Sequence, residues 1–90
     1  MTQDEIRQQV RTMILGNFLE GQDASVLRDD MSLERAHIVD SVRALEMIVF
    51  IEETFGFTVD NEDAVPENFD TVSNIVTYIA SKIGASKAGA

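Results

Sequence analysis

The stretch IVDSVRALEMIVFIEETFG, residues 38–56, decides the fold of this chain. An aspartate and a serine precede a run whose apolar residues recur every three or four positions, and a glycine ends it. Asp and Ser are favoured at helix starts, and Gly is favoured just past helix ends. The stretch therefore predicts a helix that begins at Asp40 or Ser41 and runs to about Phe55, where Gly56 stops it.

Similar patterns predict two more long helices and a short one. The first follows Thr2, which stands three residues before Glu5, the spacing of a capping box. The last follows an N-cap at Asp70 or Thr71. Their apolar faces are Ile6, Val10, Met13, Ile14 and Phe18 in the first, and Val72, Ile75, Val76, Ile79 and Ile83 in the last. Pro66 permits only a helix of one or two turns between residues 64 and 69.

These elements predict an all-α fold, a small four-helix bundle with three main helices and one short helix. We expect a single domain over residues 1–83 and a flexible tail over residues 84–90. A long connection, residues 20–39, separates the first two helices and has no strong period. Such a connection is usually functional or packed against the body, and this one has its own apolar anchors: Val26, Leu27, Met31, Leu33, Ile38 and Val39.

The size and charge of the chain exclude several classes of function. Ninety residues make one domain, which is too small for most self-contained enzymes. Sixteen acidic residues against seven basic ones give a net charge of −9, which argues against nucleic acid and anionic membranes and favours protein partners with basic docking surfaces. Residues 40–70 hold nine acidic residues and one basic residue, so this segment is the electrostatic face.

The chain has no cysteine, which excludes disulfides and thiol catalysis and suits a reducing cytoplasmic location. The polar start from Met1 to Glu5 is unlike a signal peptide, and no apolar run approaches the length of a membrane span. We therefore expect a cytoplasmic protein, and a monomer.

The helix predicted after Asp40 has apolar residues on two sides. One third of its circumference would face a core, with Ala44, Met47, Ile48, Ile51 and Phe55. Val42, Val49 and Phe50 lie on the far side. Either they pack against the connection of residues 20–39, or they form a docking face whose flanking carboxylates steer a basic partner.

Few residues are suited to catalysis or to metal binding. A triad of Ser41, His37 and Asp40 would crowd its three members into five residues without an evident oxyanion donor. The acidic run that begins at Asp60 lacks the glycine and the bidentate glutamate of a calcium loop. We therefore expect no enzyme and no dedicated metal site.

The tripeptide Asp40-Ser41-Val42 is what remains. Asp40 is placed to cap the helix, and Ser41 on one interpretation is merely an early helical residue. On the other interpretation its hydroxyl points outward, where the positive end of the helix would stabilise an attached phosphate diester.

In this context the sequence resembles the acyl carrier protein family, which includes peptidyl and aminoacyl carriers. The resemblance runs from about Leu33 through Ile83 and is carried by residues 38–42, 45–47, 50–56 and 66–69, with Val72 and Ile75. Asp-Ser-Leu is the usual modification triplet of the family, and Val42 stands in place of its Leu. The resemblance implies that a phosphopantetheinyl transferase attaches 4′-phosphopantetheine from coenzyme A to Ser41. It also implies that Asp40 caps the helix and helps to hold the metal in the transferase complex.

The resemblance implies further roles along the same helix. Val42, Glu46, Val49 and Glu53 match the positions at which the family recognises its partners, which here would be enzymes that load and process acyl or aminoacyl groups. Met47, Ile48, Ile51, Phe55 and Ile75 are expected to border the space that takes up a short acyl chain. The chain itself would carry a thioester and catalyse nothing.

Three departures from the family pattern bear on the pathway. Arg43 stands where many fatty-acid carriers have an acid, His37 stands where glycine is frequent, and residues 65–69 are more typical of freestanding carriers from specialised pathways. We therefore expect a dedicated carrier in a polyketide, nonribosomal or modified fatty-acid pathway. The alternatives are a housekeeping fatty-acid carrier and, from another class, an unmodified helical adaptor, which would have no reason to keep both Asp40 and Ser41.

Overall fold

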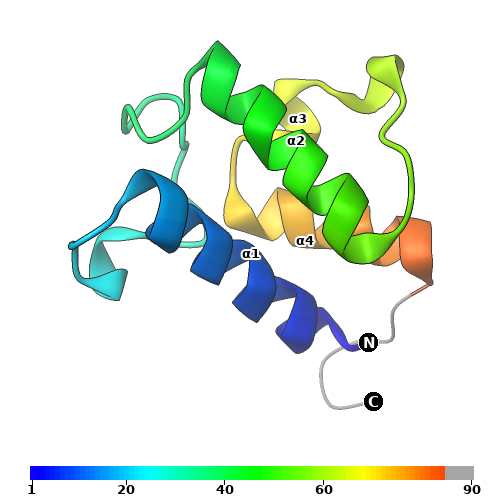
Figure 1. Ribbon diagram of the computed structural model, residues 1–90, viewed down its shortest axis with the longest axis horizontal. Helices are drawn as coiled ribbons and strands as arrows, with labels where there is room; N and C mark the ends of the chain where they lie inside the picture. The colour runs from blue at the N-terminus through cyan, green and yellow to red at the C-terminus, as the bar shows by residue number, and fades with distance from the viewer. Residues whose placement is uncertain (85–90) are drawn as a thin grey trace.

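A computed structural model describes residues 1–84, and helices form its body (Figure 1). The α-helices of this part are α1 (Gln3–Phe18), α2 (Ser41–Phe55), α3 (Pro66–Phe69) and α4 (Val72–Ile83). Two single-turn 3-10 helices, Ala24–Val26 and Asn61–Asp63, were not predicted. No β-strand occurs in the described residues, so the predicted all-α fold is confirmed. The predicted tail lies outside this range except for Gly84.

Local capping explains where the helices begin and end. The Glu5 backbone N–H donates to Thr2 Oγ1 (3.2 Å) and the Thr2 N–H donates to Glu5 Oε1 (2.8 Å), which completes the predicted capping box. Thr71 caps α4 by accepting a bond from the Asn74 N–H (3.0 Å). Gly56 ends α2 in the left-handed conformation, with φ of 77°, which glycine adopts without a steric penalty.

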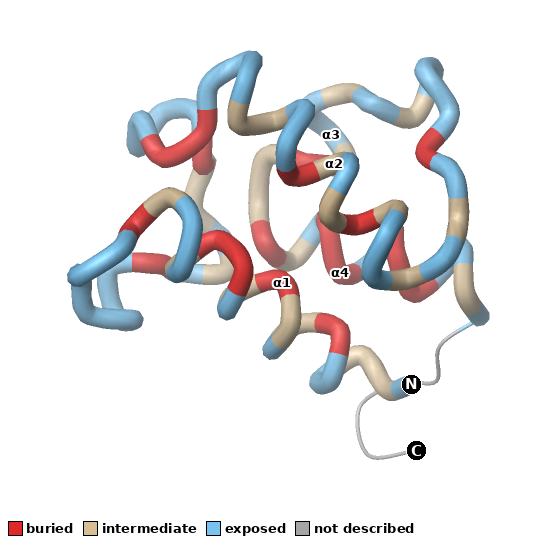
Figure 2. Tube along the Cα trace, viewed as in Figure 1, coloured by how far each residue is buried: buried red, intermediate tan, exposed pale blue. Residues whose placement is uncertain are grey.

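One hydrophobic core joins the helices to the long connection. α1 and α2 run in opposite directions, and α4 packs against α1, α3 and α2 (Figure 1). Figure 2 shows buried segments on each of the longer helices and within the connection. The fully buried side chains include Ile6 and Ile14 of α1, Met47 and Ile51 of α2, and Ile75 and Ile79 of α4. Each such side chain contributes about 1.5–3 kcal/mol through burial, so the predicted apolar faces account for the assembly.

Arginines of α1 hold the connection against the helices. Arg11 Nη1 donates to the carbonyl of Leu27 and to Asp29 Oδ1, both at 2.7 Å, and its Nη2 donates to the carbonyl of Ala24 at 3.1 Å. Arg7 Nε lies 2.8 Å from Asp29 Oδ2. The carbonyl of Asp29 accepts a bond from the Ser73 N–H of α4 (3.0 Å). The connection of residues 20–39 is therefore packed against the helices, which was one of the two roles expected for a connection of this length.

Asp63 fixes the segment between α2 and α3 to α4. Tyr78 Oη donates to Asp63 Oδ2 (2.9 Å), which also lies 3.3 Å from Lys82 Nζ. The side-chain amide of Asn68 donates to the Asp63 carbonyl (2.9 Å). Burial of the phenol, together with its bond to Asp63 and the charge of that carboxylate, raises the pKa of Tyr78 to about 12. These contacts hold α3 and the segment before it against α4.

A direct titration tests this arrangement, because the chain has one tyrosine and no tryptophan. Tyrosinate absorbance should show that Tyr78 is half-ionised near pH 12 in the folded protein and near pH 10 in the urea-unfolded chain. The raised pKa means that the folded state retains the proton longer. The contribution of Tyr78 to stability is therefore complete below about pH 10 and is lost as the pH rises toward 12. An ordinary midpoint in the folded state would show that Tyr78 is solvated and that Asp63 does not hold it.

Candidate functional site

The segment that leads to Ser41 is closed around Leu33. This side chain is fully buried, and its N–H donates to the Asp70 carbonyl (2.8 Å). The Leu33 carbonyl accepts bonds from the N–H groups of Ile38 (3.0 Å) and Val39 (3.2 Å). Asp70 Oδ1 accepts the Glu34 N–H (3.1 Å). The loop is thus tied to the start of α4 and to itself, which fixes where α2 begins.

Asp40 and Ser41 form the start of α2 as predicted. Asp40 has an extended backbone, and its Oδ1 accepts the Arg43 N–H at 2.9 Å, which is the bonding pattern of an N-cap. Ser41 is the first helical residue and is exposed. The remaining backbone N–H groups of the first turn have no acceptor within the helix, so this end favours an anion. The site therefore offers an accessible hydroxyl beside a partial positive charge.

The structure explains the cationic residue at position 43. Arg43 Nη1 donates to the Ile38 carbonyl (2.9 Å), and the guanidinium carbon lies 5.3 Å from the centre of the Phe18 ring. A guanidinium over an aromatic face is attracted by the ring quadrupole. The charge of Arg43 is therefore turned toward the loop and the end of α1, where it adds a second tie between the loop and the helices.

His37 adopts a backbone conformation that favours glycine. Its φ is 60°, and it is the one non-glycine residue with positive φ among residues 1–84. Left-handed conformations cost residues with a Cβ about 1–2 kcal/mol, although His tolerates them better than most. Histidine in place of glycine at position 37 therefore leaves backbone strain in the loop, four residues before Ser41.

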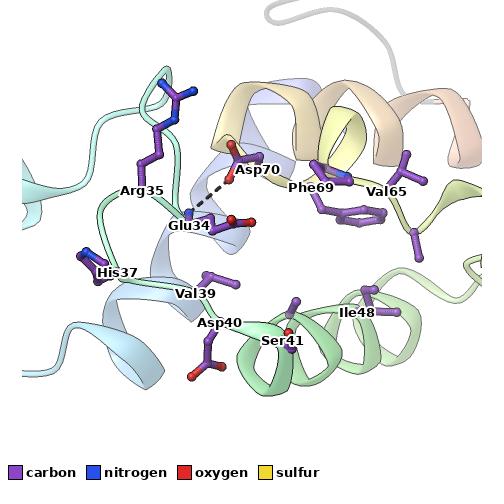
Figure 3. Close-up of a pocket in the computed structure, with 13 residues that line it drawn as sticks. Glu34, Arg35, His37, Val39, Asp40, Ser41, Ile48, Val65, Phe69 and Asp70 are labelled. Atoms are coloured by element: carbon purple, nitrogen blue, oxygen red, sulfur yellow. Dashed lines mark hydrogen bonds between the residues drawn. The ribbon is translucent and has the colours of Figure 1, made fainter.

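A cleft of about 800 Å³ lies between the loop, α2 and α3, and Ser41 lines it (Figure 3). Of the five residues expected to border a space for an acyl chain, Ile48 lines the cleft. Met47, Ile51 and Ile75 are fully buried in the core, and Phe55 is half-buried outside the cleft lining. For these four, which lie on the faces that close the bundle, a place beside an acyl chain stays a prediction. Sequence reasoning did not point to Val39, Ala44, Val65 and Phe69, which line the cleft together with Ile48.

The outer face of α2 exposes three apolar side chains. Val42, Leu45 and Val49 are 64%, 65% and 50% exposed, and Glu46 and Glu53 are also exposed. Val42 and Val49 therefore do not pack against the connection. Sequence reasoning missed Leu45, because its helical angle falls between the two apolar faces.

Phe50 behaves differently from the two valines. It is half-buried and packs against the core. With Met13 and Asn17 of α1 it lines a second groove, so it is less free than the two valines to contact a partner.

Comparisons with known proteins agree with this geometry. Residues 9–79 match the family model described as a phosphopantetheine attachment site. The chain is 30% identical over 83 residues to an acyl carrier protein of an Exiguobacterium species, an alignment that covers 92% of this chain and all of that protein. It is 31% identical over 65 residues to the D-alanyl carrier protein of Abiotrophia defectiva, covering 71% of this chain and 82% of that one. The solved structure of an acyl carrier protein from Enterococcus faecalis is similar with a TM-score of 0.71 and 31% identity, covering 90% of this chain and 98% of that one.

Fold and site together define a small helical carrier domain. The chain belongs to the acyl carrier protein family, whose phosphopantetheine-binding domain carries covalently attached 4′-phosphopantetheine. No helix in residues 1–84 combines the length and the apolar character needed to cross a membrane.

A substitution at His37 tests whether the loop before Ser41 is strained. His37→Gly should raise the free energy of unfolding by about 0.5–1 kcal/mol, because relief of the left-handed strain exceeds the entropy that glycine gains in the unfolded chain. His37→Ala is the matched control, since it removes the imidazole and keeps a Cβ. Urea unfolding of the three proteins measures the difference. Equal stability of the glycine and alanine variants would refute strain at this position.

Proposed function

We propose that this protein holds an acyl or aminoacyl group as a thioester on a 4′-phosphopantetheine arm attached to Ser41, and presents it to partner enzymes. One observation carries the assignment of Ser41. Its exposed hydroxyl stands at the first position of α2, directly after the Asp40 cap and at the cleft, within the residues that match the family model. As a carrier, the chain supplies no catalytic group of its own.

The residues around Ser41 fit such an arm. The backbone N–H groups of the first turn of α2 and the helix dipole stabilise the negative charge of a phosphate diester. The arm supplies the thiol that a chain without cysteine lacks. Ser41 contributes the oxygen that bonds to phosphorus. Asp40 holds the helix start through the Arg43 N–H, and in the transferase complex it would help to hold the metal.

The partner surface is proposed to be the outer face of α2. Its exposed apolar residues, Val42, Leu45 and Val49, offer contact area, and Glu46 and Glu53 offer negative charge. A phosphopantetheinyl transferase, and the enzymes that load and process the cargo, would approach this face with basic surfaces.

A specialised pathway is proposed over general fatty-acid synthesis. Many fatty-acid carriers have an acidic residue at position 43. Here the position is taken by Arg43, whose side chain contacts the Ile38 carbonyl and the Phe18 ring of the same chain. The relatives include a D-alanyl carrier protein. The second candidate is a housekeeping carrier, which similarity to proteins named acyl carrier protein favours. Elongation by a reconstituted fatty-acid synthase distinguishes the two, since a dedicated carrier should support it poorly.

Modification of a single serine tests the proposed attachment site. Incubation with coenzyme A and a broad-specificity transferase should add one phosphopantetheine by intact mass, and Ser41→Ala should abolish the addition. Ser73→Ala is the matched control, because Ser73 also lies in the first turn of a helix but follows no aspartate. An unmodified wild-type chain, under conditions that modify a known carrier, would contradict the proposal. Modification of Ser41→Ala would move the site elsewhere.

Charge reversal tests the partner surface. Glu46→Lys with Glu53→Lys should slow association with the transferase at low salt, and the effect should shrink as salt screens the charges. Folding should change little, because exposed charges contribute only about 0–1 kcal/mol. Val49→Ala and Leu45→Ala should weaken binding with little dependence on salt, since they remove apolar contact.

The control for charge is Glu20→Lys with Asp30→Lys, an equal reversal at exposed positions away from α2. Modification rates against salt are measured for all variants, with circular dichroism to check the fold. If the double variant of α2 and the control variant are modified by the transferase at equal rates at low salt, the outer face of α2 does not recognise the transferase.

A further inference from the structure

The cleft beside Ser41 has an apolar wall and an acidic end. Ile48 of α2 and Val65 and Phe69 on the opposite side form the wall. Figure 3 shows the Glu34 side chain directed from the loop into the space between α2 and Phe69. If the arm on Ser41 folds back into the cleft, a short apolar segment at its end can bury its methylene groups against this wall, and a group that projects from it toward the loop would meet the Glu34 carboxylate.

The charges that line the cleft are mostly negative. Glu34, Asp40 and Asp70 contribute three carboxylates, and Arg35 is the one arginine or lysine of the lining within residues 1–84. Figure 3 shows Arg35 extending away from Ser41 and from the apolar wall. No ion pair involves Glu34 in this part of the chain.

The second carboxylate of the acidic end is held in place. Asp70 Oδ1 accepts the Glu34 backbone N–H at 3.1 Å, so the two carboxylates belong to neighbouring points of the lining. Because like charges repel, a carboxylate on the cargo would be disfavoured here, whereas a cation would be attracted.

We infer that the cleft selects cargo that combines a short apolar segment with a terminal ammonium group, the chemistry of an aminoacyl thioester whose amino group lies at the end of its carbon chain. Neutral acyl groups of the same size gain only the apolar contact, and acyl groups that end in a carboxylate are repelled toward solvent. Glu34 is the residue that determines this preference. The inference rests on the proposed attachment at Ser41 and names the class of cargo for that site.

Three cargoes of similar size test the preference. A broad-specificity transferase loads the full chain from butyryl, β-alanyl and malonyl coenzyme A, which end in a methyl, an ammonium and a carboxylate group. Urea unfolding at 25 °C, which avoids thermal loss of the thioester, should give the highest midpoint for the β-alanyl form and the lowest for the malonyl form. Because an exposed ion pair is weak, we expect steps on the order of 0.5 M. Amide chemical shifts of Glu34, Val65 and Phe69 should change most in the β-alanyl form.

The matched variants assign the effect to one carboxylate. Glu34→Gln should reduce the difference between the β-alanyl and butyryl midpoints by at least half, whereas Glu20→Gln, with the same change of net charge away from the cleft, should preserve it. Equal midpoints and shifts for all three loaded forms would overturn the inference while leaving the carrier function intact. An order that survives in Glu34→Gln would also overturn it. Failure of all three cargoes to load would overturn the proposed function, and this inference with it.

Discussion

The position of Ser41 depends on the burial of one residue in the connection, Leu33. Its side chain is fully buried, its N–H bonds to the Asp70 carbonyl, and its own carbonyl accepts the N–H groups of Ile38 and Val39. A buried backbone that satisfies its polar groups in this way has few alternative conformations. Asp70 lies between α3 and α4. The bond between Leu33 and Asp70 therefore joins the loop before α2 to the opposite side of the cleft.

Other features of the site follow from that closure. The tight return from Leu33 to Val39 requires a left-handed residue, and His37 occupies it despite its Cβ. The Ile38 carbonyl is then available to Arg43, whose guanidinium also contacts Phe18. Two ties therefore hold the start of α2, one through backbone bonds and one through a side chain. This explains how a loop of exposed polar residues can present a serine in a fixed place.

Local signals in the sequence were sufficient to predict the helix ends and the candidate serine. Thr2 with Glu5, Asp40, Gly56 and Thr71 act on neighbouring backbone groups, so their effect can be read from spacing alone. For Val42 and Val49 the spacing showed only that they lie opposite the core face of α2, and their exposure is a finding of the structure.

Features that depend on contacts between distant segments could not be predicted in the same way. The cleft lining combines residues of the loop, α2 and α3, whereas Met47, Ile51 and Ile75, which the family resemblance placed beside an acyl chain, are in the core. The groove that Phe50 lines with α1, and the partners of Arg43 and Asp63, carry no sequence signal. Leu45 was missed because a residue between two faces becomes exposed or buried according to how the helix is rotated in the bundle.

Amide hydrogen exchange across residues 30–45 tests most directly whether the loop before Ser41 is held as described. The N–H groups of Leu33, Ile38 and Val39 donate to carbonyls, whereas those of Asp30 and Ser32 donate no bond in the described structure. Because opening the first three requires disruption of the core, they should exchange more slowly than Asp30 and Ser32 by on the order of 10³-fold or more after correction for intrinsic rates. Exchange of Leu33, Ile38 and Val39 as fast as that of Asp30 would show that the loop is open in solution, and would contradict the account of how Ser41 is positioned.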